Sequence, residues 1–118
     1  MYLVKFTQDG LADVKALPKS IRNSLKRKIK DGLARDYGCS MELCEPLKGW
    51  RSFHWGKYRI VFRIYDELKT IAIAGIGERL PRSQSDIYRK LETLAREGKL
   101  AQKVLAALQE FSSSEKRR

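Results

Sequence analysis

Residues 58–65, Tyr-Arg-Ile-Val-Phe-Arg-Ile-Tyr, constrain the fold more than any other segment because their side chains alternate with a period of two. Successive side chains of a β-strand point to opposite faces of a sheet, so the segment predicts a strand with two distinct faces. One face carries the even positions: Tyr58, Ile60, Phe62 and Ile64. The other carries the odd positions: Arg59, Val61, Arg63 and Tyr65. We expect the first face to pack against helices and the second to place two guanidinium groups near the middle of the sheet.

Three more segments have the character of strands. Residues 51–55 and 69–77 flank the alternating segment, and the linkers 56–57 and 66–68 are short enough for hairpin connections. Consecutive strands joined in this way form an antiparallel meander. Residues 2–7 predict a further strand at the N-terminus, with three apolar side chains on one face: Tyr2, Val4 and Phe6.

Two amphipathic helices are predicted between the first strand and the meander. Leu11, Val14 and Leu17 recur every three residues, which predicts a short helix that Pro18 ends. A second helix is predicted over 18–36, with an apolar stripe at four-residue spacing: Ile21, Leu25, Ile29 and Leu33. Seven basic residues surround that stripe: Lys19, Arg22, Lys26, Arg27, Lys28, Lys30 and Arg35. This helix therefore presents one face to the core and a strongly basic face outwards.

The C-terminal part predicts two more helices. A loop over 37–49 precedes the meander, and Ser83 to Asp86 has the spacing of a capping box that starts a third helix. Gly98 ends that helix, and a last helix is predicted over 99–111, with an apolar stripe: Leu100, Val104, Leu108 and Phe111. Residues 112–118 predict a disordered basic tail.

These elements predict a single α+β domain over residues 1–111 in the order β-α-α-β-β-β-α-α. The helix pair of the N-terminal half has to cover one face of the sheet to bury its apolar stripe. We expect the other face of the sheet to remain at least partly open.

The charge of the chain favours an anionic partner. Lys and Arg number 25 against 14 Asp and Glu, which gives a formal net charge of +11, and such an excess suits nucleic acid, an acidic protein or a membrane surface. The alternative is a soluble domain that is simply basic. We expect a cytoplasmic protein with no membrane segment and no signal peptide. One His and two Cys fall short of a structural zinc site, so we expect neither metal nor cofactor.

Arg59 and Arg63 are the first candidate site residues, because a guanidinium group suits phosphate or carboxylate. The alternative is that they pair with acidic residues nearby: Asp66, Glu67 or Glu78. Four other side chains can converge on the same face: His54, Arg79, Arg82 and Tyr88. Attack of a hydroxyl on phosphate needs a proton acceptor, cations and a donor for the leaving oxygen, and these residue types supply all three.

Several short motifs, in this order and spacing, resemble the RelE/ParE toxins over about residues 2–88. They are Leu17-Pro18-Lys19-Ser20-Ile21, Pro46-Leu47-Lys48-Gly49, the run from Gly56 to Ile64, Ile76-Gly77-Glu78-Arg79 and Asp86-Ile87-Tyr88. The resemblance implies a small toxin of a type II toxin–antitoxin pair with the RelE/ParE fold: an N-terminal strand, a helical hairpin, a three-stranded antiparallel meander and C-terminal helices. It also implies neutralisation by a cognate antitoxin protein in a hetero-oligomer.

The RelE branch of the family implies a metal-independent, ribosome-dependent mRNA endonuclease that uses the RNA's own 2′-hydroxyl as nucleophile. By position, Arg59 looks like the family's central-strand catalytic arginine, Arg79 like its second phosphate-binding arginine and Tyr88 like its C-terminal tyrosine. His54 is the fourth catalytic candidate. The candidates for contact with RNA are basic side chains around this group: Arg51, Lys57, Arg63 and Arg82.

Two other functions remain open from the sequence. The RelE pattern has a lysine pair on the first hairpin strand, where this chain has Arg51, Ser52 and His54. That difference favours the ParE branch, which inhibits DNA gyrase without enzymatic activity, or an RNA-binding regulatory module with a degenerate site. In each toxin reading we expect an acidic antitoxin to dock mainly on helix 18–36 and the margin of the sheet, with helix 99–111 packed on the core or forming part of the groove.

Overall fold

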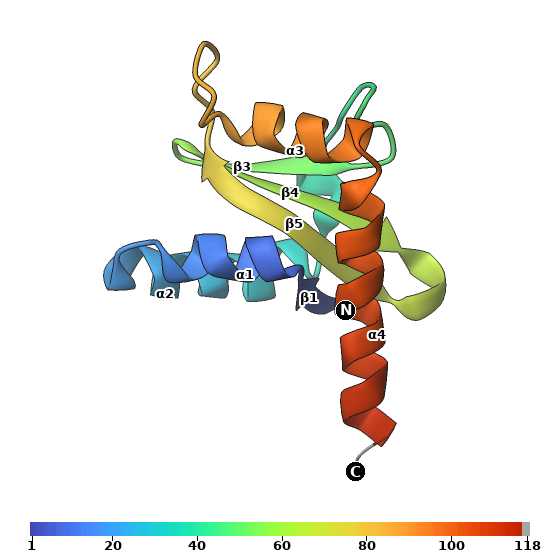
Figure 1. Cartoon of the computed structure of the whole chain (residues 1–118). Coiled ribbons are helices and arrows are strands. Elements are labelled where there is room, and N and C mark those ends of the chain that lie inside the picture. Colours follow the sequence, from blue (N-terminus) through green and yellow to red (C-terminus); the bar gives the residue numbers. More distant parts are fainter. Residues whose placement is uncertain (117–118) are drawn as a thin grey trace.

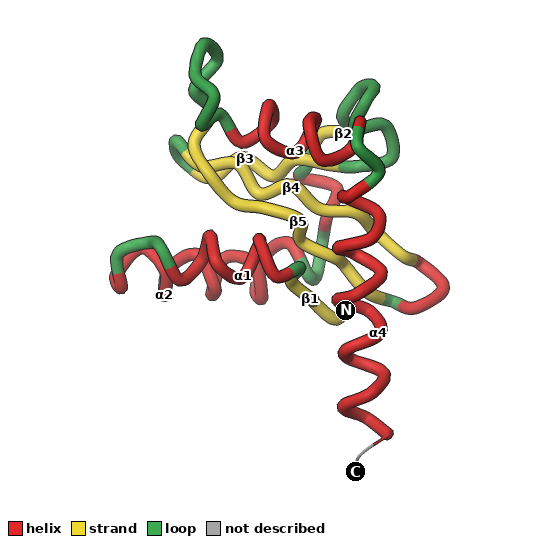
Figure 2. Tube along the Cα trace, in the orientation of Figure 1, coloured by secondary structure: helices red, strands yellow, loops and turns green. Residues whose placement is uncertain are grey.

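The computed structural model describes residues 1–116, with side chains described for residues 1–109. Five strands and four α-helices form the chain (Figures 1 and 2). The strands are β1 (Leu3–Phe6), β2 (Met41–Glu42), β3 (Arg51–Trp55), β4 (Tyr58–Tyr65) and β5 (Thr70–Glu78). The helices are α1 (Gln8–Lys15), α2 (Lys19–Lys28), α3 (Ile87–Arg96) and α4 (Lys99–Lys116). No described helix has the combination of length and apolar character that crossing a bilayer requires.

The five strands form one sheet in the order β1-β5-β4-β3-β2. The meander β3-β4-β5 is antiparallel, which confirms the prediction, and β1 runs parallel to β5 at the edge. A two-residue turn at Gly56, whose φ is +58°, joins Trp55 to its partner Tyr58. The short strand β2 lies within the segment that the sequence predicts as a loop. It could not be predicted because two residues are too few to produce a periodic pattern.

Helix α1 and its N-cap contact β5 near an irregularity in the pairing of β5 with β4. The register of β5 against β4 shifts between Val61 and Phe62, as in a β-bulge. Past that shift the backbone N–H of Ile76 donates to the Asp13 carboxylate at 2.9 Å. Thr7, which caps α1, also donates to the carbonyl of Ala74. The side chains of Asp13 in α1 and of its N-cap Thr7 therefore bond to the part of the β5 edge that β1 does not reach.

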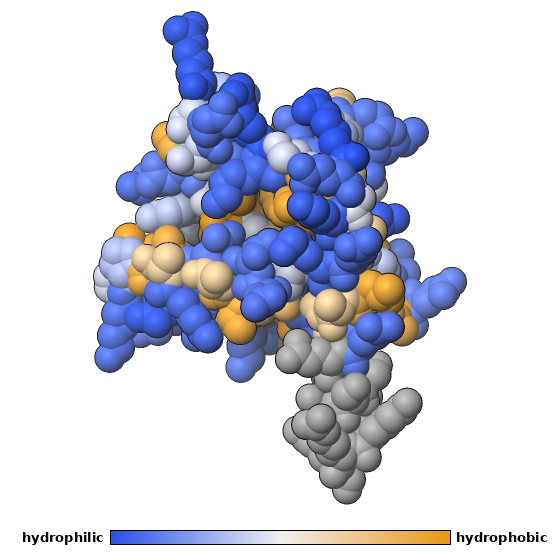
Figure 3. Space-filling view, viewed as in Figure 1, coloured by the Kyte–Doolittle hydropathy of each residue, from blue (hydrophilic) through white to orange (hydrophobic). Residues whose placement is uncertain are grey.

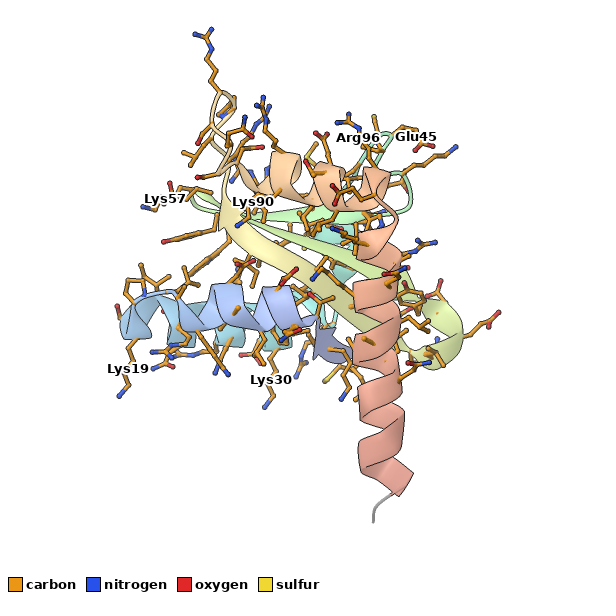
Figure 4. All side chains as sticks on the ribbon, in the orientation of Figure 1. Lys19, Lys30, Glu45, Lys57, Lys90 and Arg96 are labelled. Atoms are coloured by element: carbon orange, nitrogen blue, oxygen red, sulfur yellow. The ribbon has the colours of Figure 1, made fainter. Side chains whose placement is uncertain are left out.

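The helical hairpin α1-α2 buries its apolar stripe against one face of the sheet. Leu25 and Leu33 are fully buried in a cluster that also contains Ile60 and Phe62 of β4, as the alternation of β4 predicts. Helix α2 ends at Lys28 and one π-helical turn, Ile29–Leu33, continues the chain. Six of the seven predicted basic residues here are exposed, and Figure 4 shows Lys19 and Lys30 projecting away from the sheet.

The opposite face of the sheet is covered, which corrects the expectation that it stays open. Helices α3 and α4 pack over its middle, and a second apolar cluster joins Val61 and Ala72 of the sheet to Ile87, Leu91 and the α4 stripe (Figure 1). The α4 stripe is buried at two described positions: Leu100 and Val104. The side chain of Phe111 lies outside the described residues. The C-terminal helices form the second layer because their apolar stripes have no other surface to bury against.

The bounds of both C-terminal helices differ from those predicted. Asp86, and not Ser83, is the N-cap of α3, because its carboxylate accepts from the backbone N–H of Arg89. Gly98, with a φ of +74°, separates α3 from α4 as predicted. Helix α4 continues to Lys116, past the predicted end at 111, and residues 117 and 118 of the predicted tail lie outside the described residues.

Figure 3 shows the apolar surface between α1 and α3, with hydrophilic side chains over most of the same view.

Candidate functional site

A cleft of about 410 Å³ opens where the ends of β3 and β5 meet the start of α3 and the loop before β3. Three of the four predicted catalytic side chains line it: His54, Arg79 and Tyr88. Three carboxylates also line it: Glu45, Asp86 and Glu92. The cleft therefore combines a histidine, a guanidinium group and a phenol within one concave surface, with acidic groups on its walls.

Arg79 and Tyr88 lie against each other on one side of this cleft. Arg79 directly follows β5, and its guanidinium carbon is 5.8 Å from the centre of the Tyr88 ring. The Tyr88 hydroxyl shares a hydrogen bond of 2.8 Å with the Oγ of Ser52, a fully buried residue of β3. Tyr88 is therefore held at both ends, with its hydroxyl fixed to the sheet and its ring stacked with a cation.

His54 lies on the same sheet face as Ser52, two residues along β3. Its direct partner across the ladder is Arg59 of β4. Burial lowers the pKa of His54 below the ordinary 6.5, and the positive charges of Arg59 and Arg79 lower it further. The imidazole is consequently neutral at pH 7, the form that accepts a proton.

Arg59 lies beside the cleft and is held by the hairpin turn. Its Nη1 donates to the carbonyl oxygens of Gly56 and Tyr58, each at 3.0 Å, and its Nε is buried without a hydrogen-bond partner. Among the described residues, Arg59 forms no ion pair with the acidic residues that the sequence offered as alternatives. Its charge therefore acts on the cleft without neutralisation by a carboxylate.

The predicted RNA-contact residues do not gather around the cleft. Arg51 lies on the face of β3 that the helical hairpin α1-α2 covers. Its Nε donates to the Oγ of Ser40 at 2.6 Å and its Nη1 lies 3.3 Å from the carboxylate of Glu42, so Arg51 holds β2 against β3. Arg63 lies over the Tyr65 ring and lines a separate groove near α4.

Lys57 and Arg82 are the two of these residues that lie at the cleft end of the sheet. Lys57 forms an ion pair of 3.1 Å with Glu78 at the β3–β4 turn, and Figure 4 shows it near the loop that follows β5. Arg82 is exposed on that loop. Glu78 therefore pairs with the turn lysine and does not line the cleft.

Sequence reasoning missed two members of the site, Ser52 and Asp86. Ser52 has the same parity as His54 on β3, so the alternation already placed it on the same face as the catalytic candidates. The sequence Ser83-Gln84-Ser85-Asp86 matches the spacing of a capping box that begins at Ser83. That prediction places Asp86 inside the helix, whereas Asp86 is the N-cap itself. Within the described part of the chain, His, Cys, Asp and Glu form no group of three or more that could hold a metal ion.

The comparison with known families agrees with this architecture. Residues 4–80 match the family described as ParE toxin of type II toxin-antitoxin system, parDE. Since that match spans more than half of the chain, the protein belongs to this toxin family, within the RelE/ParE superfamily. The fold and the family expected from the sequence motifs are both confirmed.

Three individual relatives carry the RelE name, whereas the matching family is named after ParE. A putative RelE-like toxin protein of Escherichia coli is 28% identical over 92 residues, which cover 74% of this chain and 90% of the relative. The toxin–antitoxin complex RelBE2 of Mycobacterium tuberculosis contains a chain that is 30% identical, with a TM-score of 0.63 and coverage of 66% of this chain and 91% of that one. The isolated E. coli RelE toxin has the same fold, with a TM-score of 0.57 at 18% identity and coverage of 79% and 97%.

Proposed function

We propose that this toxin is a metal-independent RNA endonuclease that cuts mRNA on the ribosome and so inhibits translation. The observation that carries the proposal is the cleft that joins a neutral histidine, His54, to Arg79 and Tyr88, with the unpaired charge of Arg59 beside them. A proton acceptor next to fixed cations is what attack of a hydroxyl on a phosphodiester requires.

In this reaction His54 accepts the proton of an RNA 2′-hydroxyl, whose oxygen attacks the adjacent phosphorus. A bond forms between the 2′-oxygen and phosphorus, and the bond to the 5′-oxygen of the next nucleotide breaks. Tyr88 supplies a proton to that leaving oxygen, and the proton held by His54 then returns to Tyr88 through water, which restores both side chains. Arg79 and Arg59 stabilise the negative charge that develops on the phosphoryl oxygens. The products are a 2′,3′-cyclic phosphate and a 5′-hydroxyl.

The ribosome as the place of action is supported by the charge of the molecule. A net charge of +11 attracts an RNA surface over a long range. The exposed lysines and arginines of α2 face away from the sheet and leave the cleft free. Contacts of this kind position a protein on RNA without reading its sequence. We propose that α2 and Arg82 make such contacts, in the cytoplasm, while the cleft receives the mRNA.

The partner that we propose is an acidic antitoxin. A groove of about 450 Å³ between α4 and the loop before β3 has an apolar lining that includes Trp50, Leu105 and Leu108. Its charged lining residues are Lys48 and Arg63, and no carboxylate lines it among residues 1–109, whose side chains the structure describes. An amphipathic acidic segment suits this groove, with apolar side chains inside and carboxylates at the two cations. The structure of a relative in a complex with its antitoxin supports a partner of this type.

Inhibition of DNA gyrase is the second candidate function, and the family match to ParE toxins favours it. A paired experiment separates the two. The purified protein is added to a translating extract, where new mRNA 5′-ends are mapped, and to a gyrase supercoiling reaction. We expect mRNA cleavage that stops in the His54→Ala and Arg79→Ala variants, with supercoiling unaffected. Lys15→Ala is the matched control and retains cleavage, because Lys15 is an exposed residue of α1 on the other side of the sheet. Intact mRNA together with blocked supercoiling decides for the gyrase function.

A further inference from the structure

Asp86 connects the two segments that carry the cleft's cation and phenol. The residue is buried, with 6% of its surface exposed, at the end of the loop that follows β5. Its Oδ1 accepts from the backbone N–H of Leu80, the residue next to Arg79. Its Oδ2 accepts from the backbone N–H of Arg89, the residue next to Tyr88. One carboxylate therefore contacts the immediate neighbours of both side chains.

We propose that Asp86 is a positioning residue that holds Arg79 against the Tyr88 ring, beyond its ordinary role of capping α3. An N-cap needs only one acceptor for the first turn of a helix. The second oxygen of Asp86 instead fixes the backbone at the point where β5 ends and the exposed loop begins. Because Leu80 is itself more than a third exposed, apolar packing there is incomplete and this hydrogen bond sets the direction in which Arg79 leaves the strand.

The rest of the loop supports this arrangement. Ser83 donates its backbone N–H to the carbonyl of Leu80, and Asp86 donates its own to Ser83, so the loop closes on itself as two successive turns. The Oγ of Ser83 accepts from Ser85 and contacts neither Arg79 nor Tyr88. The side chain of Asp86 thus bonds to the segments that carry Arg79 and Tyr88, whereas the side chain of Ser83 bonds within the loop.

Asp86→Ser separates the two roles of the carboxylate. Serine is among the best N-cap residues, so the first turn of α3 keeps its acceptor. Its single oxygen is too close to its own backbone to reach Leu80 as well. Asp86→Asn is the second variant, since it replaces one of the two carboxylate oxygens by an NH2 donor, which cannot accept from the N–H group on that side. Ser83→Ala is the matched control, because it changes the same loop without removing the connection.

The test that does not depend on any activity is the titration of His54 by NMR, together with the ring-current shift of the Arg79 side-chain protons over Tyr88. The chain has a single histidine, so its signal is unambiguous. If Asp86 holds Arg79 in place, Asp86→Ser moves the Arg79 signals towards those of a free side chain and raises the pKa of His54, because a cation has moved away. Loss of the Asp86 charge alone would lower the pKa of His54, so the sign of the change identifies the cause.

The activity arm rests on the proposed function. We expect mRNA cleavage by Asp86→Ser and Asp86→Asn to fall about tenfold or more, as small displacements of catalytic groups do, while Ser83→Ala keeps the wild-type rate. Unchanged Arg79 signals in both Asp86 variants, with the pKa of His54 unchanged or lowered, overturn the positioning role whatever the activity. If these signals move in the Asp86 variants while the wild-type protein cuts no RNA, the positioning role is upheld and the nuclease is refuted.

Discussion

His54 of β3 and Arg59 of β4 are direct partners in the antiparallel ladder, and both side chains lie on the sheet face that α3 covers. The Arg59 Nη1 is held by two carbonyl oxygens of the hairpin turn, so the guanidinium group cannot swing away from the histidine without breaking those bonds. This pair gives the cleft a base that is deprotonated at neutral pH and a cation that stays beside it.

The first prediction concerns the titration of His54. In the wild-type protein its pKa lies below 6.5, and Arg59→Gln or Arg79→Gln raises it, because each removes a positive charge that disfavours the imidazolium form. Arg63→Gln is the control and leaves the pKa unchanged. Cleavage should fall on acidification with a midpoint below pH 6.5, since protonated His54 cannot accept a proton. NMR titration and a pH–rate profile measure the two quantities; a rate that rises as the pH falls through this range contradicts a basic role for His54.

The second prediction concerns the hydrogen bond between Ser52 and Tyr88. Ser52→Ala removes the partner of the Tyr88 hydroxyl at a fully buried position and should lower the free energy of unfolding by about 1 kcal/mol. Tyr88→Phe removes the same bond and also the proposed proton donor, so its cleavage should fall by a further factor of about 10² or more. Urea denaturation and cleavage rates of both variants make the comparison. Equal cleavage rates for Ser52→Ala and Tyr88→Phe would show that the Tyr88 hydroxyl does not act as the proton donor.

A third prediction tests the support that α1 gives to the β5 edge. Burial raises the pKa of Asp13 above its ordinary value, so the folded state binds the proton of this carboxyl more tightly than the unfolded state does. The stability that this tighter proton binding contributes is present at low pH and is lost as the pH rises through the raised pKa. Asp13→Asn keeps an acceptor for the Ile76 N–H and removes the charge, so at pH 7 it should be as stable as the wild type or more stable.

Asp13→Ala is the matched comparison. It leaves the Ile76 N–H without its partner, which should lower the free energy of unfolding by about 1–3 kcal/mol. Urea denaturation at pH 7 gives both values. A large loss of stability in Asp13→Asn would mean that the charge itself, and not the hydrogen bond, supports the edge.

The fourth prediction concerns the surface that we propose binds the antitoxin. Leu105→Asp and Arg63→Glu alter the cation-lined groove beside α4 and should weaken binding of the acidic antitoxin about tenfold or more, because one removes an apolar contact and the other reverses a charge. Lys26→Glu on the exposed face of α2 should slow association with a smaller effect on dissociation. Surface plasmon resonance separates the two rate constants. Tight binding by the groove variants, with loss of binding in Lys26→Glu, would place the main contact on α2 instead.

Much of the fold is predictable from periodicity. The alternation of β4 assigns its two faces, and the four-residue stripe of the predicted helix 18–36 identifies residues that are buried against the sheet, Leu25 and Leu33 among them. The role of α4 is harder to predict, because its stripe is equally consistent with core packing and with a partner surface. The structure shows core packing at Leu100 and Val104, which are buried, whereas Leu105 is 54% exposed and is available to the proposed partner.

The candidate site is predictable in its residue types and less so in its geometry. His54, Arg79 and Tyr88 meet in the cleft, but Arg51 lies on the opposite face because it is an odd-numbered residue of β3 while His54 is even. Asp86 is the least accessible to sequence reasoning. Its second hydrogen bond depends on how the loop after β5 folds back, and that path follows from tertiary packing and not from local spacing.

The most direct test of the proposed mechanism uses an mRNA with a single 2′-deoxy nucleotide. That nucleotide stands at the position whose 2′-hydroxyl acts as the nucleophile in the proposed reaction. The wild-type toxin first maps the cleavage position on the all-RNA message in a translating extract, and a message with the single 2′-deoxy substitution at that position is then compared. The proposed mechanism predicts cleavage of the first message, with a 2′,3′-cyclic phosphate at the new 3′-end, and none at that position in the second. Equal cleavage of the two messages would show that the nucleophile is not the RNA's own hydroxyl and would contradict the mechanism.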